Sequence, residues 1–307
     1  DSDADGIKDG AELSVGMDPN RHDLMDDPDQ DGYTNLVEYH VGSDPLDQSS
    51  IPTADFVVDA AGGGDFTTVS SALDALSEPY QVIVVQPGVY EETLRSTRYP
   101  VLLQAASQNP YETVLRATTS APLLYADKDI YVTGFMLTRR GSSHRGFEFR
   151  GTYGGMRNCI IENHYLYGYR GGGAYLEIPS HGEFRFVNCL IQNNKVRDYG
   201  GGIFHRGGRL KIDHCTFFGN RDIRSSGNAL CLSGPGQTEI SNSILWDYDD
   251  QEIRRHAPLI VTNSLVRGGY TGSGNLSADP LLRQGYLHPD SPAIDAGSAD
   301  SGVISDL

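Results

Sequence analysis

Two short acidic stretches near the start of the chain place side chains at the spacing that a calcium ion requires. The stretches are DSDADGIKDGAE at residues 1–12 and DPDQDGYTNLVE at residues 27–38. In each, carboxylates at alternate positions can converge on one hard cation, a glycine permits the sharp turn, and the closing glutamate can bind through both oxygens. The expected ligands are Asp1, Asp3, Asp5, Ile7, Asp9 and Glu12 in the first stretch and Asp27, Asp29, Asp31, Tyr33, Asn35 and Glu38 in the second. The sequence therefore predicts about two calcium ions, with Ile7 and Tyr33 contributing backbone carbonyls; the alternative is a solvated acidic linker.

The negative charge of the chain is concentrated in this region. Residues 1–50 contain fourteen acidic and two basic side chains, whereas the whole chain has a formal net charge of −17. No basic face is evident that could release counterions from phosphates, so nucleic acid is excluded as a partner. No apolar run approaches the length of a membrane span. Since neither an initiator Met nor a signal peptide is present, we expect a mature or trimmed portion of a protein.

The second half of the chain is an internal repeat. The pairs Asn158-Cys159, Asn188-Cys189, His214-Cys215, Asn242-Ser243 and Asn263-Ser264 recur at intervals of 21 to 30 residues. Apolar and polar residues alternate before each pair, as in a strand with one buried face. Like residues recurring in register indicate stacked coils, and the Gly-rich step before several strands suits tight corners. We therefore predict an all-β, right-handed parallel β-helix (solenoid).

The predicted organisation is a calcium-binding, EF-hand-like segment at residues 1–47, a linker at 48–53, and the β-helix at 54–307. Val69, Ala72, Leu73 and Leu76 share one face of a short helix that would cap the open end of the coil. The four cysteines are expected to be free, buried thiols, because three share one repeat position; a bridge between neighbouring coils is the alternative. Asn163, Asn194 and Asn220 are expected to stack at a corner.

Three segments resemble known families. DSDADGIKDGAE and DPDQDGYTNLVEYHVGSDP resemble thrombospondin type 3 and dockerin-like calcium repeats, which implies a rigid structural calcium site outside the cell. Residues 54–94 resemble the first coil of pectin-methylesterase-like and pectate-lyase-like β-helix proteins, although no motif matches the esterase family's catalytic aspartates. The repeats and ADPLLRQGYLHPDSPAIDAG resemble bacterial autotransporters and secreted bacterial β-helix proteins.

Candidate residues for chemistry lie on the predicted walls of the coil. In β-helix polysaccharide lyases a cation neutralises the uronate and an Arg or Lys removes the adjacent proton. Weak candidates for such a role are Arg185, Lys211, His205 and Arg209, and weak candidates for substrate binding are Tyr165, Tyr167, Tyr175, Tyr199 and Arg206. These residues could equally be ordinary solvated side chains. Asp127 with Asp129, or Asp247 with Asp249 and Asp250, could pair as hydrolase carboxylates.

The sequence is compatible with three functions. The first is a secreted or cell-surface, calcium-stabilised structural module, such as an adhesin, filament or matrix component, that could bind glycans. The alternatives are a lyase or other carbohydrate-active enzyme acting on an acidic polysaccharide, and a carbohydrate-binding accessory module. The expected partners of the protein are a polysaccharide, other copies of the chain or cell-surface components. Fold alone cannot decide among them.

Overall fold

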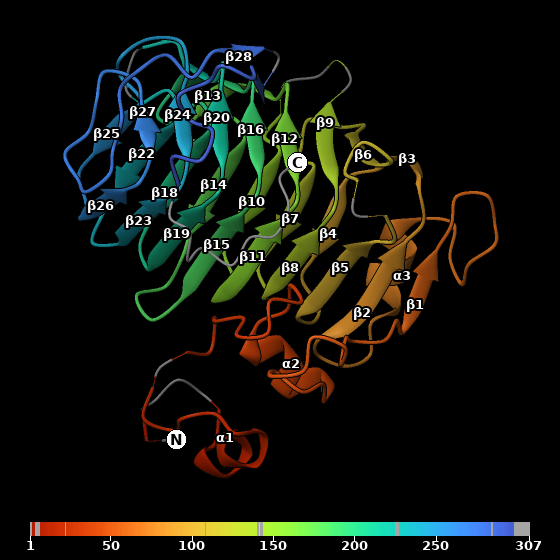
Figure 1. The fold of residues 1–307 in the computed structure, drawn as a ribbon. Coiled ribbons are helices and arrows are strands. Elements are labelled where there is room, and N and C mark those ends of the chain that lie inside the picture. Colours follow the sequence, from red (N-terminus) through yellow and green to blue (C-terminus); the bar gives the residue numbers. More distant parts are fainter. Residues whose placement is uncertain are drawn as a thin grey trace.

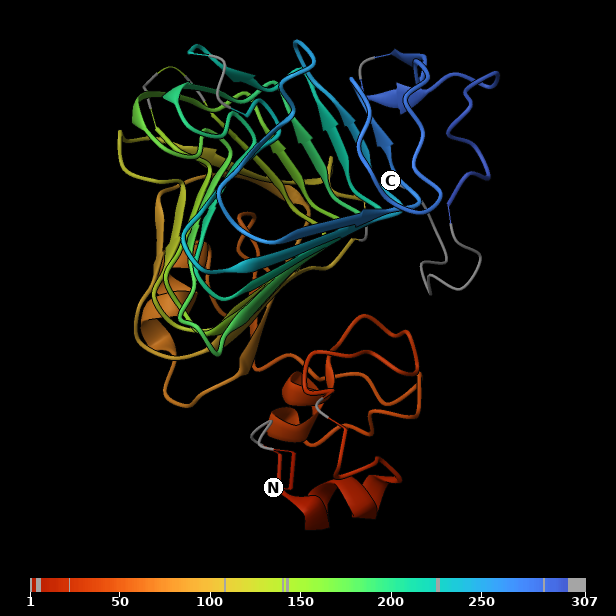
Figure 2. The same ribbon diagram turned by 90° about the vertical axis from the view of Figure 1, so that its left-hand side faces the viewer.

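The chain folds as the predicted right-handed parallel β-helix (Figure 1). The computed structural model describes residues 2–3, 7–21, 23–107, 109–139, 141, 144–224, 227–283 and 285–297. Three long parallel sheets form the walls of the solenoid within these residues, and Figure 2 shows that the walls enclose one interior. The interior is filled by side chains that alternate along each strand, including Phe147, Phe149, Phe184, Phe186 and Phe217.

The strands of each wall stack in chain order, with every coil paired to the next. Sheet A contains β1 (Phe56–Val58), β2 (Gln81–Val85), β5 (Val101–Ala105), β8 (Ile130–Thr133), β11 (Tyr153–Arg157), β15 (Glu183–Val187), β19 (Arg209–Asp213), β23 (Gln237–Ser241) and β26 (Leu259–Thr262). Sheet B contains β3 (Gly88–Glu91), β6 (Thr113–Ala117), β9 (Met136–Arg139), β12 (Ile160–Glu162), β16 (Leu190–Gln192), β20 (Thr216–Phe218), β24 (Ile244–Trp246) and β27 (Leu265–Val266). Sheet C contains β4 (Leu94–Ser96), β7 (Leu124–Ala126), β10 (Phe147–Phe149), β14 (Ala174–Glu177), β18 (Ile203–Arg206), β22 (Leu230–Ser233) and β25 (Ile253–Arg255).

Two smaller sheets complete the described strands. Sheet D lies between sheets B and C along the chain and contains β13 (Tyr165–Tyr169), β17 (Lys195–Asp198) and β21 (Arg221–Asp222). Near the C-terminus, β28 (Leu282–Arg283) and β29 (Tyr286–Leu287) form an antiparallel pair. The predicted cap is helix α3 (Val69–Ala75), whose Thr68 side chain accepts a hydrogen bond from the Ser71 N–H and whose Val69, Ala72 and Leu73 are buried.

The repeated anchor residues turn the chain from sheet A into sheet B. Asn158, Asn188, His214, Asn242 and Asn263 all have φ between 46° and 50°. Such a left-handed conformation is unfavourable for most L-residues and is tolerated best by Gly, Asn and Asp, which explains the choice of Asn. The residues that follow point inward, and all four cysteines are buried and free, as expected. In the last coils Ser243 accepts a hydrogen bond from the Cys215 N–H at 3.0 Å.

A polar ladder runs through the interior at another corner. Side chains of Asn194, Asn220 and Asp247 each accept a hydrogen bond from the backbone N–H one coil earlier, at 3.1, 3.1 and 2.6 Å. The predicted Asn163 is not part of this ladder: it is exposed with φ of 60°, and the buried His164 takes the position instead. The prediction was wrong by one residue because Asn163 adopts the left-handed turn that the corner requires.

The ladder ends on a pair of buried carboxyl groups. Glu252 Oε1 accepts a hydrogen bond from the Asp247 N–H at 2.6 Å, and both side chains are at most 4% exposed. Burial raises the pKa of both groups, and the negative charge of Asp247 raises that of Glu252 further. Each group therefore keeps its proton to a higher pH than an exposed carboxyl does.

We expect Glu252→Gln to increase stability at alkaline pH. Because the folded-state pKa values are raised, the wild-type pair contributes stability below the ordinary carboxyl pKa near 4 and loses it as pH rises. The Gln amide is uncharged at every pH. In urea unfolding from pH 5 to 9, the advantage of the variant should grow by about 1 kcal/mol per pH unit. An advantage that does not change with pH, or that also occurs in the exposed Glu78→Gln control, would contradict this account.

The N-terminal segment packs against the outer face of sheet A. Its helices α1 (Asp9–Val15) and α2 (Asn35–Val41) are joined by the second acidic loop. Leu24, Met25 and Val37 share an apolar cluster with Val82 and Leu102 of the sheet. The His40 ring also stacks on Tyr80 at a centroid distance of 4.0 Å. We call residues 7–47 the head. Its apolar residues form one cluster with residues on the outer face of sheet A. None of the described helices is long and apolar enough to cross a membrane.

Candidate functional sites

The second acidic loop of the head brings three carboxylates together. One carboxylate oxygen from each of Asp27, Asp29 and Asp31 lies within 4.8 Å of the others. Backbone N–H groups of Asp31, Gly32 and Tyr33 hold the opposite oxygens at 3.2, 3.1 and 2.8 Å. The remaining oxygen of each aspartate is buried and has no hydrogen-bond partner among the described residues. The loop therefore presents three unsatisfied oxygens at one point.

Glu38 adds a fourth carboxyl group from α2. One of its oxygens accepts a hydrogen bond from the Ser43 hydroxyl at 3.0 Å, while Oε2 is buried without a partner in the described residues. Burial, reinforced by the neighbouring aspartates, raises the pKa of Glu38 to about 8 and that of Asp31 to about 6. Burial also raises the pKa of Asp27, against the effect of Arg157. These buried oxygen donors match the preference of a hard divalent cation.

The remaining predicted ligands are placed less uniformly. Tyr33 follows the three aspartates, and the buried Asn35 begins α2 and donates to the Asp23 carbonyl at 3.0 Å. In the first loop, Asp1 and Asp5 lie outside the described residues. Ile7 and Glu12 are buried, and Asp9 accepts hydrogen bonds from Ser2 at 2.7 and 2.9 Å. Asp3 is half-buried. Within the described residues, the cluster of three carboxylates is found in the second loop.

The head also engages two cations of sheet A, of which Arg185 was a candidate for catalysis. Arg185 Nη2 lies 3.1 Å from Asp26, and Arg157 Nη1 lies 3.3 Å from Asp27. Glu183, which is 7% exposed, also pairs with Arg185, with Arg209 at 3.4 Å and with Lys211 at 3.8 Å. The cavity left between the head and this part of the sheet is only about 80 Å³. Ligand pockets usually have a volume of roughly 300 Å³ or more, so a sugar ring does not fit there.

His205 lies apart from these three cations. It points into the solenoid and is 1% exposed, and its Nδ1 lies 3.0 Å from the Thr238 hydroxyl. Burial lowers its pKa to about 4, so the imidazole is neutral at physiological pH. A substrate outside the coil cannot reach it. The four predicted catalytic residues are therefore not assembled into one site.

The outer face of sheet C carries a different group of predicted residues. Tyr175, Phe204 and Cys231 form a small apolar cluster on consecutive strands, with Tyr199 packed against it. The Tyr175 and Phe204 rings are stacked, with centroids 5.4 Å apart and planes inclined by 4°. At 6% exposure, Tyr175 cannot offer an open ring face to a sugar, in contrast to the expectation from sequence. It forms the base of a surface instead.

Arginines cover these rings. The guanidinium carbons lie 4.7 Å (Arg145) and 5.2 Å (Arg150) from the centre of Tyr175, 5.2 Å (Arg170) from that of Phe204 and 4.8 Å (Arg254) from that of Tyr199. An aromatic face attracts a guanidinium group and fixes its plane, while its N–H groups remain available to carboxylates. We call Arg145, Arg150, Arg170, Arg206 and Arg254, with the rings below them, the arginine surface. Within it, an open cavity of about 450 Å³ is lined by Arg145, Arg150, Arg170, Tyr175 and Tyr199.

The charges of the arginine surface are only partly balanced. Glu148 pairs with Arg145 and Arg150, and Glu177 pairs with Arg150 and, at 3.5 Å, with Arg206. In the part of the chain that the structure describes, neither Arg170 nor Arg254 has an ion pair with a carboxylate. Arg170 is exposed. In a chain with a net charge of −17, these cations are available to an external anion.

Tyr165 and Tyr167, the remaining predicted substrate contacts, lie on sheet D. Their ring centroids are 4.7 Å apart, and Tyr167 is 70% exposed. Sequence reasoning identified Tyr175, Tyr199 and Arg206 but missed the arginines that cover the rings. Arg145 and Arg170 each stand directly before a glycine, in HRGF and YRGG, shortly ahead of the successive strands β10 and β14. That recurrence was the signal available for finding them.

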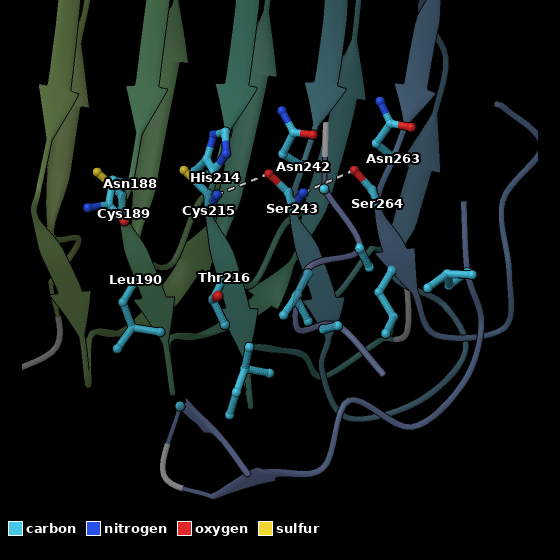
Figure 3. A pocket seen from close by; sticks show the side chains of 18 of the residues that line it. Asn188, Cys189, Leu190, His214, Cys215, Thr216, Asn242, Ser243, Asn263 and Ser264 are labelled. Atoms are coloured by element: carbon cyan, nitrogen blue, oxygen red, sulfur yellow. Dashed lines mark hydrogen bonds between the residues drawn. The ribbon is translucent and has the colours of Figure 1, made fainter. Parts of the chain in front are cut away.

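A separate cavity of about 480 Å³ lies between sheet B and the C-terminal segment (Figure 3). Asn188, His214, Asn242 and Asn263 form a row along one side of it. His214 and Asn242 are tied to Asp213 at 3.0 and 2.9 Å. Its described lining contains no arginine or lysine, so the cavity does not match an acidic ligand.

Comparison with known proteins shows similarity to pectin-modifying enzymes. No family model matches the chain. A probable pectinesterase/pectinesterase inhibitor from Arabidopsis thaliana is 38% identical over 78 residues, which span 25% of this chain and 15% of that protein. The carrot pectin methylesterase structure superposes with a TM-score of 0.54 at 15% identity, covering 75% of this chain and 85% of the enzyme. The pectin methylesterase from Aspergillus niger superposes with a TM-score of 0.51 at 16% identity, covering 75% of this chain and 87% of that enzyme. At these identities the structural likeness establishes the shared fold.

Proposed function

We propose that the chain binds an acidic polysaccharide on the arginine surface of sheet C. The observation that carries this proposal is the presence of Arg170 and Arg254, which rest on aromatic rings and lack a carboxylate partner in the described residues. Their guanidinium groups are held in place before a ligand arrives, which reduces the entropy lost on binding. A uronate carboxylate can accept two parallel hydrogen bonds from one guanidinium group.

The comparisons make a pectin-like polymer the first ligand to test. The partial match is to a pectinesterase, and a pectin methylesterase solved with a hexasaccharide shares the fold at 13% identity with a TM-score of 0.51. These similarities favour the carbohydrate-active alternative over an adhesin, filament or matrix component, for which they provide no support. A secreted or cell-surface protein would encounter such a polymer.

Binding, rather than catalysis, is the activity that the geometry supports. The sheet A cations proposed for β-elimination are paired with Glu183 or with head aspartates, and His205 is enclosed. On the arginine surface, Glu148 and Glu177 are held by arginines. Both carboxylates are therefore already engaged by the protein before a ligand arrives.

Removing the two unpaired cations should weaken binding of oligogalacturonate. In Arg170→Ala/Arg254→Ala, two charge-assisted contacts are lost, and we expect the affinity measured by calorimetry to fall by about tenfold to a hundredfold. Wild-type binding should weaken as salt rises, because exposed charges are screened. Arg98→Ala/Arg283→Ala removes two cations elsewhere and serves as the control. Equal affinity for the variant and the wild type would contradict the proposal.

We also propose that the second acidic loop binds one calcium ion through Asp27, Asp29, Asp31 and Glu38. Support comes from the buried, unpartnered oxygens of these four side chains and from the burial, reinforced by mutual repulsion, that raises the pKa of Asp31 and Glu38. An ion there would neutralise the repulsion and hold the loop that carries Asp26 and Asp27 to Arg185 and Arg157. Its effect would therefore extend to sheet A.

Calcium should raise the stability of the whole chain. At a concentration one hundred times its dissociation constant, a ligand specific for the folded state contributes about 2.7 kcal/mol. Asp31→Asn should remove most of the calcium-dependent shift in the unfolding temperature, whereas the exposed head variant Asp47→Asn should retain it. Calcium should also slow amide exchange in β11 and β15. If its effect were confined to residues 7–47, the proposed coupling between the head and sheet A would be wrong.

A further inference from the structure

Sheet D presents a column of aromatic and cationic side chains outside the arginine surface. Tyr165 on β13, Lys195 on β17 and Arg221 on β21 are paired in register on consecutive strands. Lys195 Nζ lies 5.4 Å from the centre of the Tyr165 ring, and the guanidinium carbon of Arg221 lies 4.1 Å from that of Tyr248. The column thus has a ring at each end and two cations between them. Neighbouring strands are about 4.8 Å apart, so the cations follow the solenoid axis at that interval.

The two cations of this column are not neutralised by the protein. Three carboxylates on or near sheet D have other partners: Asp198 pairs with Arg224 at 3.1 Å, Asp250 pairs with Arg267 at 3.2 Å, and Asp222 accepts from the backbone N–H groups of Tyr199 and Arg224. Among the residues that the structure describes, Lys195 and Arg221 form no ion pair with a carboxylate. Because the chain as a whole is strongly acidic, this local excess of positive charge is complementary to a polyanion.

The aromatic residues at the ends of the column are accessible. Tyr248 is 58% exposed, and Tyr165 is half-buried beside the 70% exposed Tyr167. Aromatic rings beside carboxylate-binding cations suit a chain of charged sugar rings, which has both apolar ring faces and acidic groups. A compact inorganic anion would use the cations but not the rings.

Sheet D adjoins the arginine surface at a glycine corner. A Cβ atom on Gly172 would lie 3.0 Å from the Lys195 backbone, and one on Gly201 would lie 2.5 Å from the Arg221 N atom. The absence of side chains at these positions lets sheet D pack directly onto the corner that leads into sheet C. Arg170 and Tyr199 immediately precede the glycine runs 171–173 and 200–202. Along the chain they therefore lie between sheet D and sheet C.

We propose that sheet D is a second subsite for the same acidic polysaccharide. Lys195 and Arg221 bind uronate carboxylates, and Tyr165 and Tyr248 contact sugar rings. This inference rests on the proposed function, because the arginine surface is taken as the first subsite. The two subsites are distinguished by how binding depends on the length of the oligosaccharide. A short oligosaccharide occupies the arginine surface, and a long one also reaches sheet D.

Lysine labelling can test contact at sheet D directly. The sequence contains four lysines, Lys8, Lys128, Lys195 and Lys211, so mass spectrometry can follow each one during reductive methylation. We expect a galacturonate decamer to slow the labelling of Lys195 about fivefold or more, while a dimer has little effect. Lys8 and Lys128 are exposed and distant in sequence from sheet D, so they report non-specific protection.

Affinity measurements on variants complete the test. Lys195→Ala/Arg221→Ala should lower the affinity for the decamer about tenfold and leave that for the dimer unchanged, because only the second subsite is lost. The control Lys128→Ala/Arg283→Ala removes two exposed cations elsewhere. It should leave the affinities for the decamer and the dimer unchanged. Urea unfolding verifies that each variant is folded.

The possible outcomes separate the two proposals. If the decamer binds but Lys195 is labelled at its usual rate, the sheet D subsite is wrong and the arginine surface stands. If Lys195 is protected and Arg170→Ala/Arg254→Ala binds normally, sheet D binds the polymer and the arginine surface is wrong. If calorimetry detects no binding and Lys195 is not protected from labelling with any oligomer, both proposals fail.

Discussion

The parallel, in-register pairing of each coil with the next is the constraint on which this structure depends. A coil obtains its backbone hydrogen-bond partners from its neighbours, so a residue must adopt nearly the same conformation as its counterparts above and below. The left-handed turn from sheet A into sheet B therefore recurs at Asn158, Asn188, His214, Asn242 and Asn263. The two ends of the stack need other partners: α3 covers the first coils, and the Asn275 side chain accepts a hydrogen bond from the Ser264 N–H in the last.

The same constraint determines where chemistry can occur. Side chains at one strand position form a line along the solenoid, with inward lines filling the core and outward lines defining the properties of each wall. The walls differ in how the charges of their cations are balanced. On sheet A, the cations are neutralised by Glu183 and by the aspartates of the head. On sheets C and D, several cations stack on aromatic rings without carboxylate partners in the described residues.

Buried carboxyl groups occur in two settings with different solutions. Asp247 and Glu252 end an interior ladder, and burial raises their pKa values, which favours the uncharged carboxyl. Asp27, Asp29 and Asp31 instead converge, with unpartnered oxygens and a neighbouring Arg157, and their charges contribute to the raised pKa of the buried Glu38. Several carboxyls at one place repel each other, which is why a divalent cation suits the head.

The sequence by itself determined the features that depend on local repetition. The Asn-Cys anchors and alternating strands predicted the β-helix, and the spacing of Asp27, Asp29 and Asp31 predicted that their carboxylates converge. Tertiary structure decided which side chains meet across distant parts of the chain. Asp26 reaches Arg185, and the Arg254 guanidinium group stacks on the Tyr199 ring, through packing between segments whose contacts leave no periodic trace in the sequence. Even within the repeat, the choice between Asn163 and His164 for the ladder depended on which residue took the turn. Periodicity specifies the stacking of like with like, whereas the neutralisation of charge depends on what is folded against each wall.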